Sequence, residues 1–258
     1  MVGKMKEDIL AASSIFQVGG QPGHSPEELL IYIKSIIARE EANKEGIIFF
    51  LMDIIKFFDK EDIYDVMQTL NDVKVNKKAA RVWFKLNAGT TVKVKTSVGM
   101  SEAAVVGDCI GQGTAGGALV SALNLDQGLE SYFAGSTDEV CYGGVRVQPL
   151  AYQDDVGRSS KSIGEAQAGN IKLSYMLQDK GLEAHPDKTG FIVIGSQKFK
   201  DKAKKDLETC PLMFGEFEVK QRKADKYLGQ IIHEDGLGCS AEATVEDRKP
   251  ESKGPPWR

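Results

Sequence analysis

Apolar residues along the chain alternate between strand-length runs and faces with helical spacing. Residues 47–52 form a continuous apolar run without charge and residues 191–194 form a second, so each predicts a strand buried on both faces. After Ser25, a good N-cap, and Pro26, a good first helical residue, apolar positions recur three and four residues apart. We therefore expect a packed helix that runs toward Gly46 and precedes the first buried strand.

The rest of the chain extends this pattern into an ordered series of elements. We expect helices near residues 63–70, 76–86, 113–129 and 163–180, one capped near Asp59, a strand over 91–98, strands around Gly143-Gly144, a hairpin at Gly215 and a final segment over 227–232. This β-α-β-β-α-β order predicts an α+β fold with a split, ferredoxin-like sheet. Residues 241–258 carry charge and proline without apolar periodicity, so we expect a folded unit over 1–240 and a disordered tail.

Two adjacent carboxylates, Asp154 and Asp155, follow Tyr152 and Gln153 and precede Val156. Because side chains alternate along a strand, neighbouring acids face one centre only where the chain turns. Two anions held so close repel each other unless a cation neutralises them, which indicates a divalent metal. If the segment is taken alone, a solvated turn with two surface aspartates is the alternative.

A third carboxylate, Asp53, closes the first buried strand, where a charge is costly without a partner. Phosphoryl transfer by two metal ions about 3.5–4 Å apart needs carboxylates from separate strands, which hold the ions from more than one side. Asp53, Asp154 and Asp155 meet that requirement. We therefore predict that these three residues form one catalytic and metal-binding cluster.

Composition fits a globular chain of 258 residues, of which 41% are hydrophobic. No apolar stretch reaches the ~18–20 residues of a membrane span and no secretory signal is visible, so we expect an intracellular protein without a membrane partner. Histidines and cysteines show no metal-binding or disulfide spacing: His24, His185, His233, Cys109, Cys141, Cys210 and Cys239.

Net charge is −4, which alone does not favour nucleic-acid binding. Basic residues nevertheless gather in two runs, over residues 74–95 around Trp83 and Phe84 and over residues 198–226. Each run suits the phosphate backbone of a template and primer. A solvated helix face, with Trp83 in the core, explains each run equally well.

Five short motifs occur in one order between residues 53 and 236. They are Asp53 with Lys56, Phe58 and Asp59; Gly111-Gln112-Gly113; Tyr152-Gln153-Asp154-Asp155; Gly181-Leu182 with Pro186, Lys188 and Thr189; and Lys226-Tyr227-Leu228-Gly229 with Gly236. In this order they resemble the reverse transcriptase domain of non-LTR (LINE-like) retrotransposons. The segment from Gly19 to Glu28 is similar to a stretch that precedes the first catalytic strand of that family. Gln21 and His24 stand there in place of the usual arginines, and Phe57 and Gly116-Gly117 are further departures.

The resemblance implies a right-hand polymerase palm with partial fingers and a primer-grip hairpin. It implies an RNA-directed DNA polymerase that uses an RNA template, a DNA primer and deoxynucleoside triphosphates. Two Mg²⁺ ions, with Mn²⁺ as an alternative, would bind Asp53, Asp154 and Asp155. The remaining roles carried over are a steric gate at Phe58, template and base-pair contact at Gln112 and Gly113, pyrophosphate stabilisation at Lys188, and the primer grip at Tyr227, Leu228 and Gly229. Core packing for Phe58 and a surface position for Lys188 are the alternatives.

The resemblance covers a palm with part of the fingers. The family's fingers strands and thumb have no counterpart among the motifs found here, and we expect activity to need them. We therefore expect the isolated chain to be inactive or nearly so. A catalytically inactive nucleic-acid-binding remnant is one alternative. An RNA-directed RNA polymerase is another, although Gln153 and Phe58 argue against it because such enzymes usually carry glycine before the two acids and polar residues after the first motif.

Overall fold

A computed structural model of the protein describes residues 2–14, 17–105, 109–111, 114, 116–133, 140–142, 145–147 and 149–236. Its helices are α1 (Val2–Ala12), α2 (Pro26–Ala42), α3 (Phe57–Lys60), α4 (Ile63–Asp72), α5 (Lys77–Asn87), α6 (Gly117–Phe133), α7 (Ile163–Asp179) and α8 (Gln197–Thr209). Its strands are β1 (Gly46–Asp53), β2 (Thr91–Val92), β3 (Lys95–Thr96), β4 (Gly99–Met100), β5 (Ala104–Val105), β6 (Val140–Tyr142), β7 (Val145–Val147), β8 (Leu150–Tyr152), β9 (Asp155–Ser160), β10 (Gly190–Gly195), β11 (Met213–Phe214), β12 (Phe217–Glu218), β13 (Lys220–Gln221), β14 (Ala224–Tyr227) and β15 (Gln230–His233). The expected tail over 241–258 and the Gly143-Gly144 turn lie outside the described residues.

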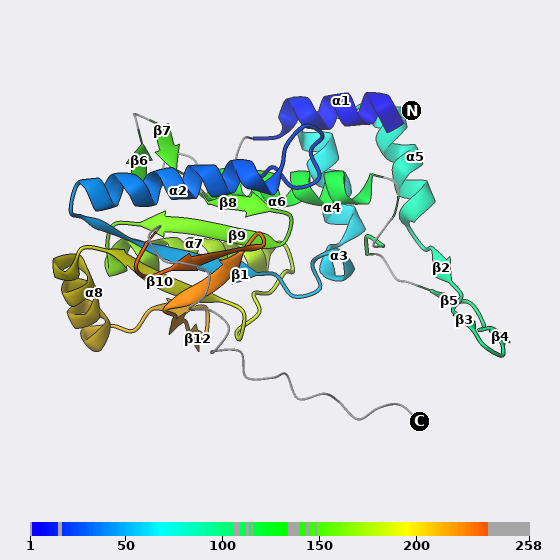
Figure 1. Cartoon of the computed structure of the whole chain (residues 1–258). Helices are drawn as coiled ribbons and strands as arrows, with labels where there is room; N and C mark the ends of the chain where they lie inside the picture. The colour runs from blue at the N-terminus through cyan, green and yellow to red at the C-terminus, as the bar shows by residue number, and fades with distance from the viewer. Residues whose placement is uncertain are drawn as a thin grey trace.

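The main sheet has five strands in the order β13-β10-β1-β9-β8 (Figure 1). β1 is central and runs antiparallel to β9 and β10, β8 runs antiparallel to β9, and β13 is parallel to β10. Helices separate β1 from β8 and β9 from β10, whereas β8 and β9 join directly. The chain therefore has the mixed α+β architecture and the β-α-β-β-α-β order that the sequence predicts.

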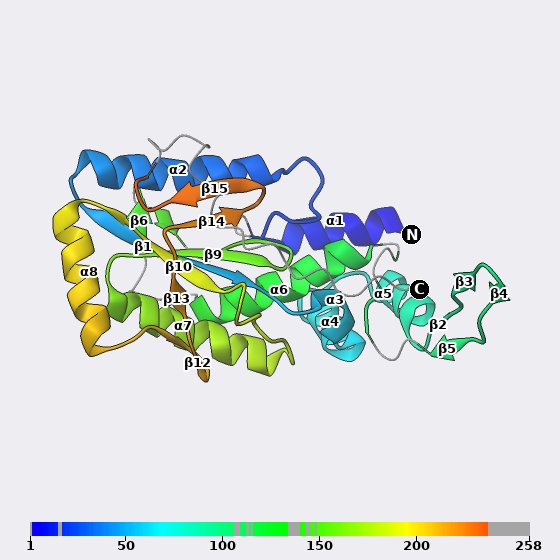
Figure 2. The same ribbon diagram turned by 60° about the horizontal axis from the view of Figure 1, so that its bottom comes forward.

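Both faces of the central strand are buried, which explains its uninterrupted apolar sequence. Ile47, Phe49 and Leu51 face a core formed with α2 and the β14–β15 hairpin. The alternate residues of the strand face a second core, formed with α6 and α7. Figures 1 and 2 show α2 and α7 on opposite sides of the sheet. A strand covered on both faces needs apolar residues at every position, so the apolar run follows from the layer order.

A third core lies among the helices beyond the end of β1 that carries Asp53 (Figures 1 and 2). Helices α1, α4, α5 and α6 supply its side chains, including Met5, Ile9 and Trp83. Helix α1 is not among the elements that the sequence predicted. Met5 and Ile9 are four residues apart on one buried helix face, which is the only signal that the sequence gives for it.

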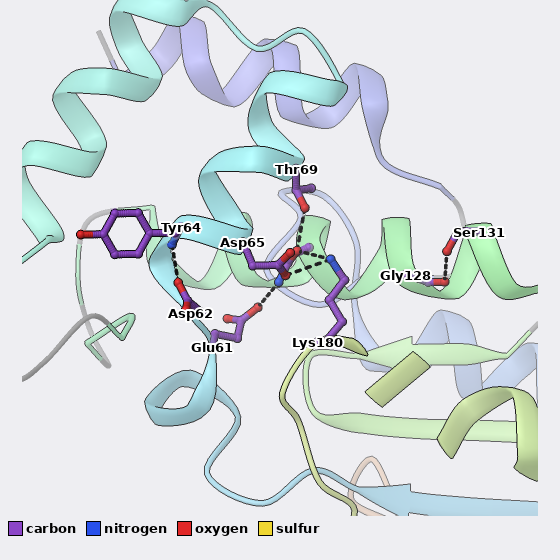
Figure 3. Close-up of polar contacts among 9 residues, drawn as sticks. Glu61, Asp62, Tyr64, Asp65, Thr69, Gly128, Ser131 and Lys180 are labelled. Carbon is purple, nitrogen blue, oxygen red and sulfur yellow. Dashed lines mark hydrogen bonds and ion pairs between the residues drawn. The ribbon is translucent and has the colours of Figure 1, made fainter. Parts of the chain in front are cut away.

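A buried polar network connects this helical end to α7 (Figure 3). Asn124 donates from Nδ2 to Glu61 Oε1 at 3.0 Å. The Oδ1 atom of Asn124 accepts from Thr69 Oγ1 at 2.7 Å and from Lys180 Nζ at 2.8 Å, and Lys180 also pairs with Asp65 at 3.0 Å. Burial raises the pKa of Glu61 to about 7. The network ties α4 and α6 to the C-terminal end of α7.

The start of the helix after β1 differs from the sequence expectation. The prediction of a helix capped near Asp59 is wrong, because α3 is a single turn that begins at Phe57 after Lys56 takes a left-handed φ of 47°. The longer helix α4 is instead capped by Asp62, whose carboxylate accepts from the Tyr64 amide at 2.6 Å. The break lets the chain turn away from the sheet after the buried strand.

The strand expected over residues 91–98 is also divided. β2 pairs with β5 and β3 pairs with β4, with Thr91 opposite Val105 and Lys95 opposite Met100. The register shifts by one residue between these pairs, so an extra residue is accommodated as in a β-bulge. Among the described helices, none combines the length and the apolar character needed to cross a lipid bilayer.

Candidate active site

The adjacent acids lie at the tip of the β8–β9 hairpin. Tyr152 pairs with Asp155, so Gln153 and Asp154 form the connecting turn. Gln153 has a left-handed φ of 56°, which residues other than glycine seldom adopt. As the sequence predicts, the two carboxylates are therefore placed at a turn and not along a continuous strand.

Asp53 lies directly beside this turn. It is the cross-strand partner of Asp155 in the β1–β9 ladder, and such partners project to the same face of a sheet. The carbonyl of Asp154 accepts from the Ile54 amide at 3.2 Å, which fixes the turn against the end of β1. Asp53 is thus on the same side of the sheet as Asp155, as a shared site requires.

The three carboxylates influence one another electrostatically. Burial, followed by the charges of Asp154 and Asp53, raises the pKa of Asp155 to about 6. Burial and the charge of Asp53 also raise the pKa of Asp154. A site with this much mutual repulsion favours a bound cation.

The side chain of Lys188 supplies a positive charge at the acids, because its ammonium contacts both carboxylate oxygens of Asp53, at 3.1 and 3.3 Å. Its charge also partly offsets the raised pKa values of Asp154 and Asp155. The loop that carries Lys188 is held beside Asp53, whose carbonyl accepts from the His185 amide at 2.8 Å. The predicted Lys188 position therefore belongs to the acid site.

A cavity of about 210 Å³ opens at this end of the sheet. Its lining combines acids with basic and aromatic side chains: Leu51, Met52, Asp53, Asp155, Asp187, Lys188, Arg222, Asp225, Lys226 and Tyr227. Arg222 also donates to the backbone carbonyls of Asp187 at 2.6 Å and Thr189 at 3.4 Å, which fixes the Lys188 loop from the C-terminal side. Groups that attract cations and groups that attract phosphate thus share one cavity.

The carboxylate oxygens at this end of the sheet are suitable ligands for a divalent ion, whereas their positions relative to one another are not those of a metal site. Carboxylate oxygens of Asp53 and Asp155 are the hard ligands that Mg²⁺ prefers. Within the described ranges, however, no three Asp, Glu, His or Cys side chains come together closely enough to hold a metal. The acids are therefore neighbours in the sheet without forming a converged set of three ligands.

Gln17, which the sequence did not single out, holds the turn that carries Asp154. Its fully buried side chain donates from Nε2 to the Gln153 carbonyl at 3.2 Å, and its Oε1 accepts from the Gln153 amide at 2.9 Å. Oε1 also accepts from the Gly19 amide at 2.9 Å. A Cβ on Gly19 would lie 2.3 Å from the Gln153 nitrogen, so only glycine fits there. Gln17 thus clamps the left-handed residue of the acid turn, and the nearby Gly19-Gly20 pair was the only sequence signal.

The predicted primer-grip residues form the turn of the β14–β15 hairpin. Leu228 and Gly229 both have positive φ, 48° and 85°, as a tight two-residue hairpin turn requires. Tyr227 donates its hydroxyl to the Leu150 carbonyl at 3.0 Å and packs edge-on against Phe49. Burial and the charge of Asp155 raise the pKa of Tyr227. Tyr227 therefore joins the hairpin to the sheet and to the wall of the acid cavity.

The remaining predicted substrate residues are less closely connected to the acids. Phe58 is half-buried, lies 5.2 Å from Phe57 between ring centroids and packs against two of the cores. It is not among the residues that line the acid cavity. Gln112 and Gly113 lie outside the described residues, so the structure does not place that motif.

The chain, with its mixed sheet and helices on both faces, is similar in fold to solved structures of telomerases. Three of the solved structures that the chain matches come from two Candida species. Apo telomerase from Candida tropicalis truncated from its C-terminal domain matches with a TM-score of 0.58 and 12% identity, over 90% of this chain and 43% of that chain. Telomerase from Candida albicans in complex with a TWJ fragment of telomeric RNA matches with a TM-score of 0.61 and 12% identity, over 90% of this chain and 36% of that chain. Apo telomerase from Candida tropicalis matches with a TM-score of 0.61 and 10% identity, over 94% of this chain and 40% of that chain.

At 10–12% identity, this similarity establishes the fold alone. The chain spans 36–43% of the length of these telomerase chains. No protein-family model and no curated protein matches the sequence.

Proposed function

We propose that this chain is the palm, with part of the fingers, of an RNA-directed DNA polymerase of the LINE-like type. The observation that carries the proposal is the pairing of Asp53 with Asp155 at the end of the central strand, next to the Asp154 turn. The motif order in the sequence and the telomerase-like fold support the same assignment.

Metal binding at the three acids is part of the proposal. Asp53, Asp154 and Asp155 would hold two Mg²⁺ ions, or Mn²⁺, which would activate a primer 3′-hydroxyl and neutralise a triphosphate when bound. Lys188 now pairs with Asp53, so its ammonium must turn away from that carboxylate as the site fills. From there it can reach the phosphates of the substrate and stabilise the leaving pyrophosphate.

The other residues at the cavity would position the reacting groups. The Tyr227-Leu228-Gly229 turn would hold the primer end, while Lys226 offers donors to phosphate oxygens. Phe58 would exclude a ribose 2′-hydroxyl, and Gln112 and Gly113 would contact the template. The Candida albicans neighbour is a complex with RNA, which supports an RNA template as the partner here.

Primer extension on an RNA template tests the catalytic part of the proposal. We expect weak Mg²⁺- or Mn²⁺-dependent incorporation of deoxynucleotides that Asp154→Asn and Asp53→Asn abolish. Asp187→Asn is the matched control, because Asp187 lines the same cavity but its side chain is 82% exposed. Extension that survives Asp53→Asn would refute the assignment, and preferential incorporation of ribonucleotides would favour an RNA polymerase.

A metal titration provides a readout that does not need turnover. Mn²⁺ should raise the melting temperature of the wild-type chain, because it relieves the repulsion among the acids, and Asp155→Asn should lose much of that response. A melting temperature that Mn²⁺ leaves unchanged would contradict a metal site here.

A catalytically inactive, nucleic-acid-binding remnant is the second candidate function. The Lys188–Asp53 pair and the absence of a converged three-ligand set within the described ranges favour it. A remnant would bind nucleic acid, show no extension and give no melting response to Mn²⁺.

A further inference from the structure

Residues 74–105 carry a charge opposite to that of the chain as a whole. This stretch has one acid, Glu102, and seven basic residues, so its formal charge is +6 within a chain of net charge −4. The seven basic residues are Lys74, Lys77, Lys78, Arg81, Lys85, Lys93 and Lys95. Such a sign reversal concentrated in one segment produces a local field that attracts anions.

All seven basic side chains are exposed. Among the described residues, none of the seven has an ion-pair partner, in contrast to Lys161, Lys180 and Lys188, which each pair with a carboxylate. The basic charge of this surface is therefore not neutralised within the folded part of the chain and is available to an external anion.

The segment after α5 forms an arm that projects from the rest of the structure (Figures 1 and 2). Among the strands that the structure describes, β2, β3, β4 and β5 pair only with one another. Val94, Val98 and Val105 are 61%, 95% and 70% exposed. A two-stranded hairpin is marginally stable alone in water, so an arm of this kind gains stability from a partner.

The position of the arm relates it to the acid site. Helix α5 and the arm lie beyond the end of β1 that carries Asp53, as the two ribbon views show. The other lysine-rich element, α8, packs at the opposite end of β1, where a Cβ on Gly46 would lie 2.4 Å from the Phe199 ring. The run over 74–95 therefore lies on the acid side, whereas the second run is divided between α8 at the opposite end of β1 and Arg222 and Lys226, which line the acid cavity.

We propose that α5 and the arm form a nucleic-acid-binding surface that holds the phosphate backbone on the acid side of the sheet. This surface is defined here as the exposed basic residues of segment 74–95. The 11-residue helix α5 is about 16 Å long, about half a turn of a duplex, and the arm continues the basic surface beyond it (Figures 1 and 2). The proposal deepens the proposed function, on which it rests for the identity of the nucleic acid, since it names the surface that would hold the template with its primer.

Binding of labelled nucleic acid to two charge-matched variants tests this surface. The first variant combines Lys78→Gln, Arg81→Gln, Lys85→Gln and Lys93→Gln. The control combines Lys198→Gln, Lys202→Gln, Lys204→Gln and Lys205→Gln, which removes the same charge from exposed positions of α8. Fluorescence anisotropy with an RNA–DNA hybrid and with single-stranded RNA distinguishes paired from unpaired backbone, and circular dichroism verifies that both variants fold.

The expected result is a selective loss in the first variant. Each phosphate contact contributes about 0.7–0.9 to the slope of log K against log salt, so losing four contacts should flatten the slope by about 3. Affinity for the hybrid should fall at least about tenfold at about 0.1 M salt, while the α8 variant stays within about twofold of wild type. Equal losses in both variants, or wild-type binding by the first, would overturn the proposal. If the first variant binds as tightly as wild type, the exposed valines of the arm would instead indicate a surface for a protein partner.

Failure of this surface and failure of the polymerase assignment give different results. Asp154→Asn should not reproduce the flattened salt dependence of the first variant, because it leaves the basic residues of segment 74–95 unchanged. If the chain binds through segment 74–95 but never extends a primer, the binding-surface proposal is supported and the polymerase assignment is refuted. If the chain extends a primer in an Asp154-dependent manner and the first variant binds normally, the polymerase assignment is supported and the binding-surface proposal is refuted.

Discussion

The ammonium of Lys188 lies 3.1 Å from Oδ2 of Asp53, although 135 positions separate the two residues in sequence. The contact exists because the loop after α7 runs beside the end of β1, where the Ile55 amide donates to the Glu183 carbonyl at 2.8 Å. The acid site therefore has an internal counter-ion, and any divalent ion that binds Asp53 competes with it.

Lys188→Met should strengthen divalent binding, because the competing ammonium is removed. The side chain of Lys188 is 60% exposed, so the pair stabilises the fold by at most about 1 kcal/mol. We expect Mn²⁺ to bind about fivefold more tightly, which corresponds to about 1 kcal/mol. Calorimetric titration measures this, with Lys220→Met as the control because Lys220 is an exposed lysine beside Asp187. Weaker binding by Lys188→Met would show that Lys188 assists the ion.

Gln17→Leu should destabilise the acid turn while retaining the volume of the side chain. The change leaves the amide and carbonyl of Gln153 and the amide of Gly19 without their partner, at a cost of about 3 kcal/mol. Urea unfolding measures the loss, and faster hydrogen exchange at the Gln153 amide locates it. Gln197→Leu, on exposed helix α8, should change neither quantity. An exchange rate at Gln153 equal to wild type would show that the turn holds its shape without the clamp.

Glu61→Gln should remove one pH dependence of stability. The folded-state pKa is about 7, raised by burial, against about 4.3 in an unfolded chain, so the folded state holds the proton more tightly between these values. Stability from this group is therefore fully present at low pH, decreases as pH rises toward 7 and is constant above it, by a total of about 4 kcal/mol. Lys180 and Asp65 are the charged neighbours in the network, and their contacts persist in the variant.

Unfolding free energies of wild type and Glu61→Gln between pH 5 and pH 8 measure this effect. The difference between the two curves should grow in favour of the variant as pH rises. Parallel curves would mean that Glu61 stays ionised, or stays protonated, throughout that range.

Tyr227→Phe should cost about 1–1.5 kcal/mol, because the buried Leu150 carbonyl loses its hydroxyl donor while the ring keeps its contact with Phe49. Urea unfolding measures the cost. Tyr64→Phe, at an exposed helix position, is the control. A cost below about 0.3 kcal/mol would show that water satisfies the Leu150 carbonyl in the variant.

Local patterns predicted the parts of the fold that depend on burial alone. Residues 47–52 of β1 and 191–194 of β10 are apolar at every position because both faces are covered, and helix α7 ends shortly before Gly181, which has the left-handed φ that such an end favours. The turn placement of Asp154 followed from strand alternation. These features need only the neighbouring sequence.

The parts that the sequence did not predict depend on distant contacts. Gln17 hydrogen-bonds Gln153 from 136 positions away, and apart from the Gly19-Gly20 pair no neighbouring residue indicates that its amide is buried. The first helix was missed because its mixed polar sequence is stabilised by contact with α5 and α6 and not by its own pattern. The three acids remain candidate ligands, because adjacency in a sheet does not by itself fix the directions of their side chains.

The central position of β1 has a consequence for the order of events during protein synthesis. β1 lies between β9 and β10, so it is made early and then waits for partners that leave the ribosome more than a hundred residues later. Contacts of such long range slow folding and leave an apolar strand exposed in the meantime. Nascent chains stopped before residue 195 should therefore bind chaperones strongly and resist release, whereas chains that include β10 should fold and dissociate.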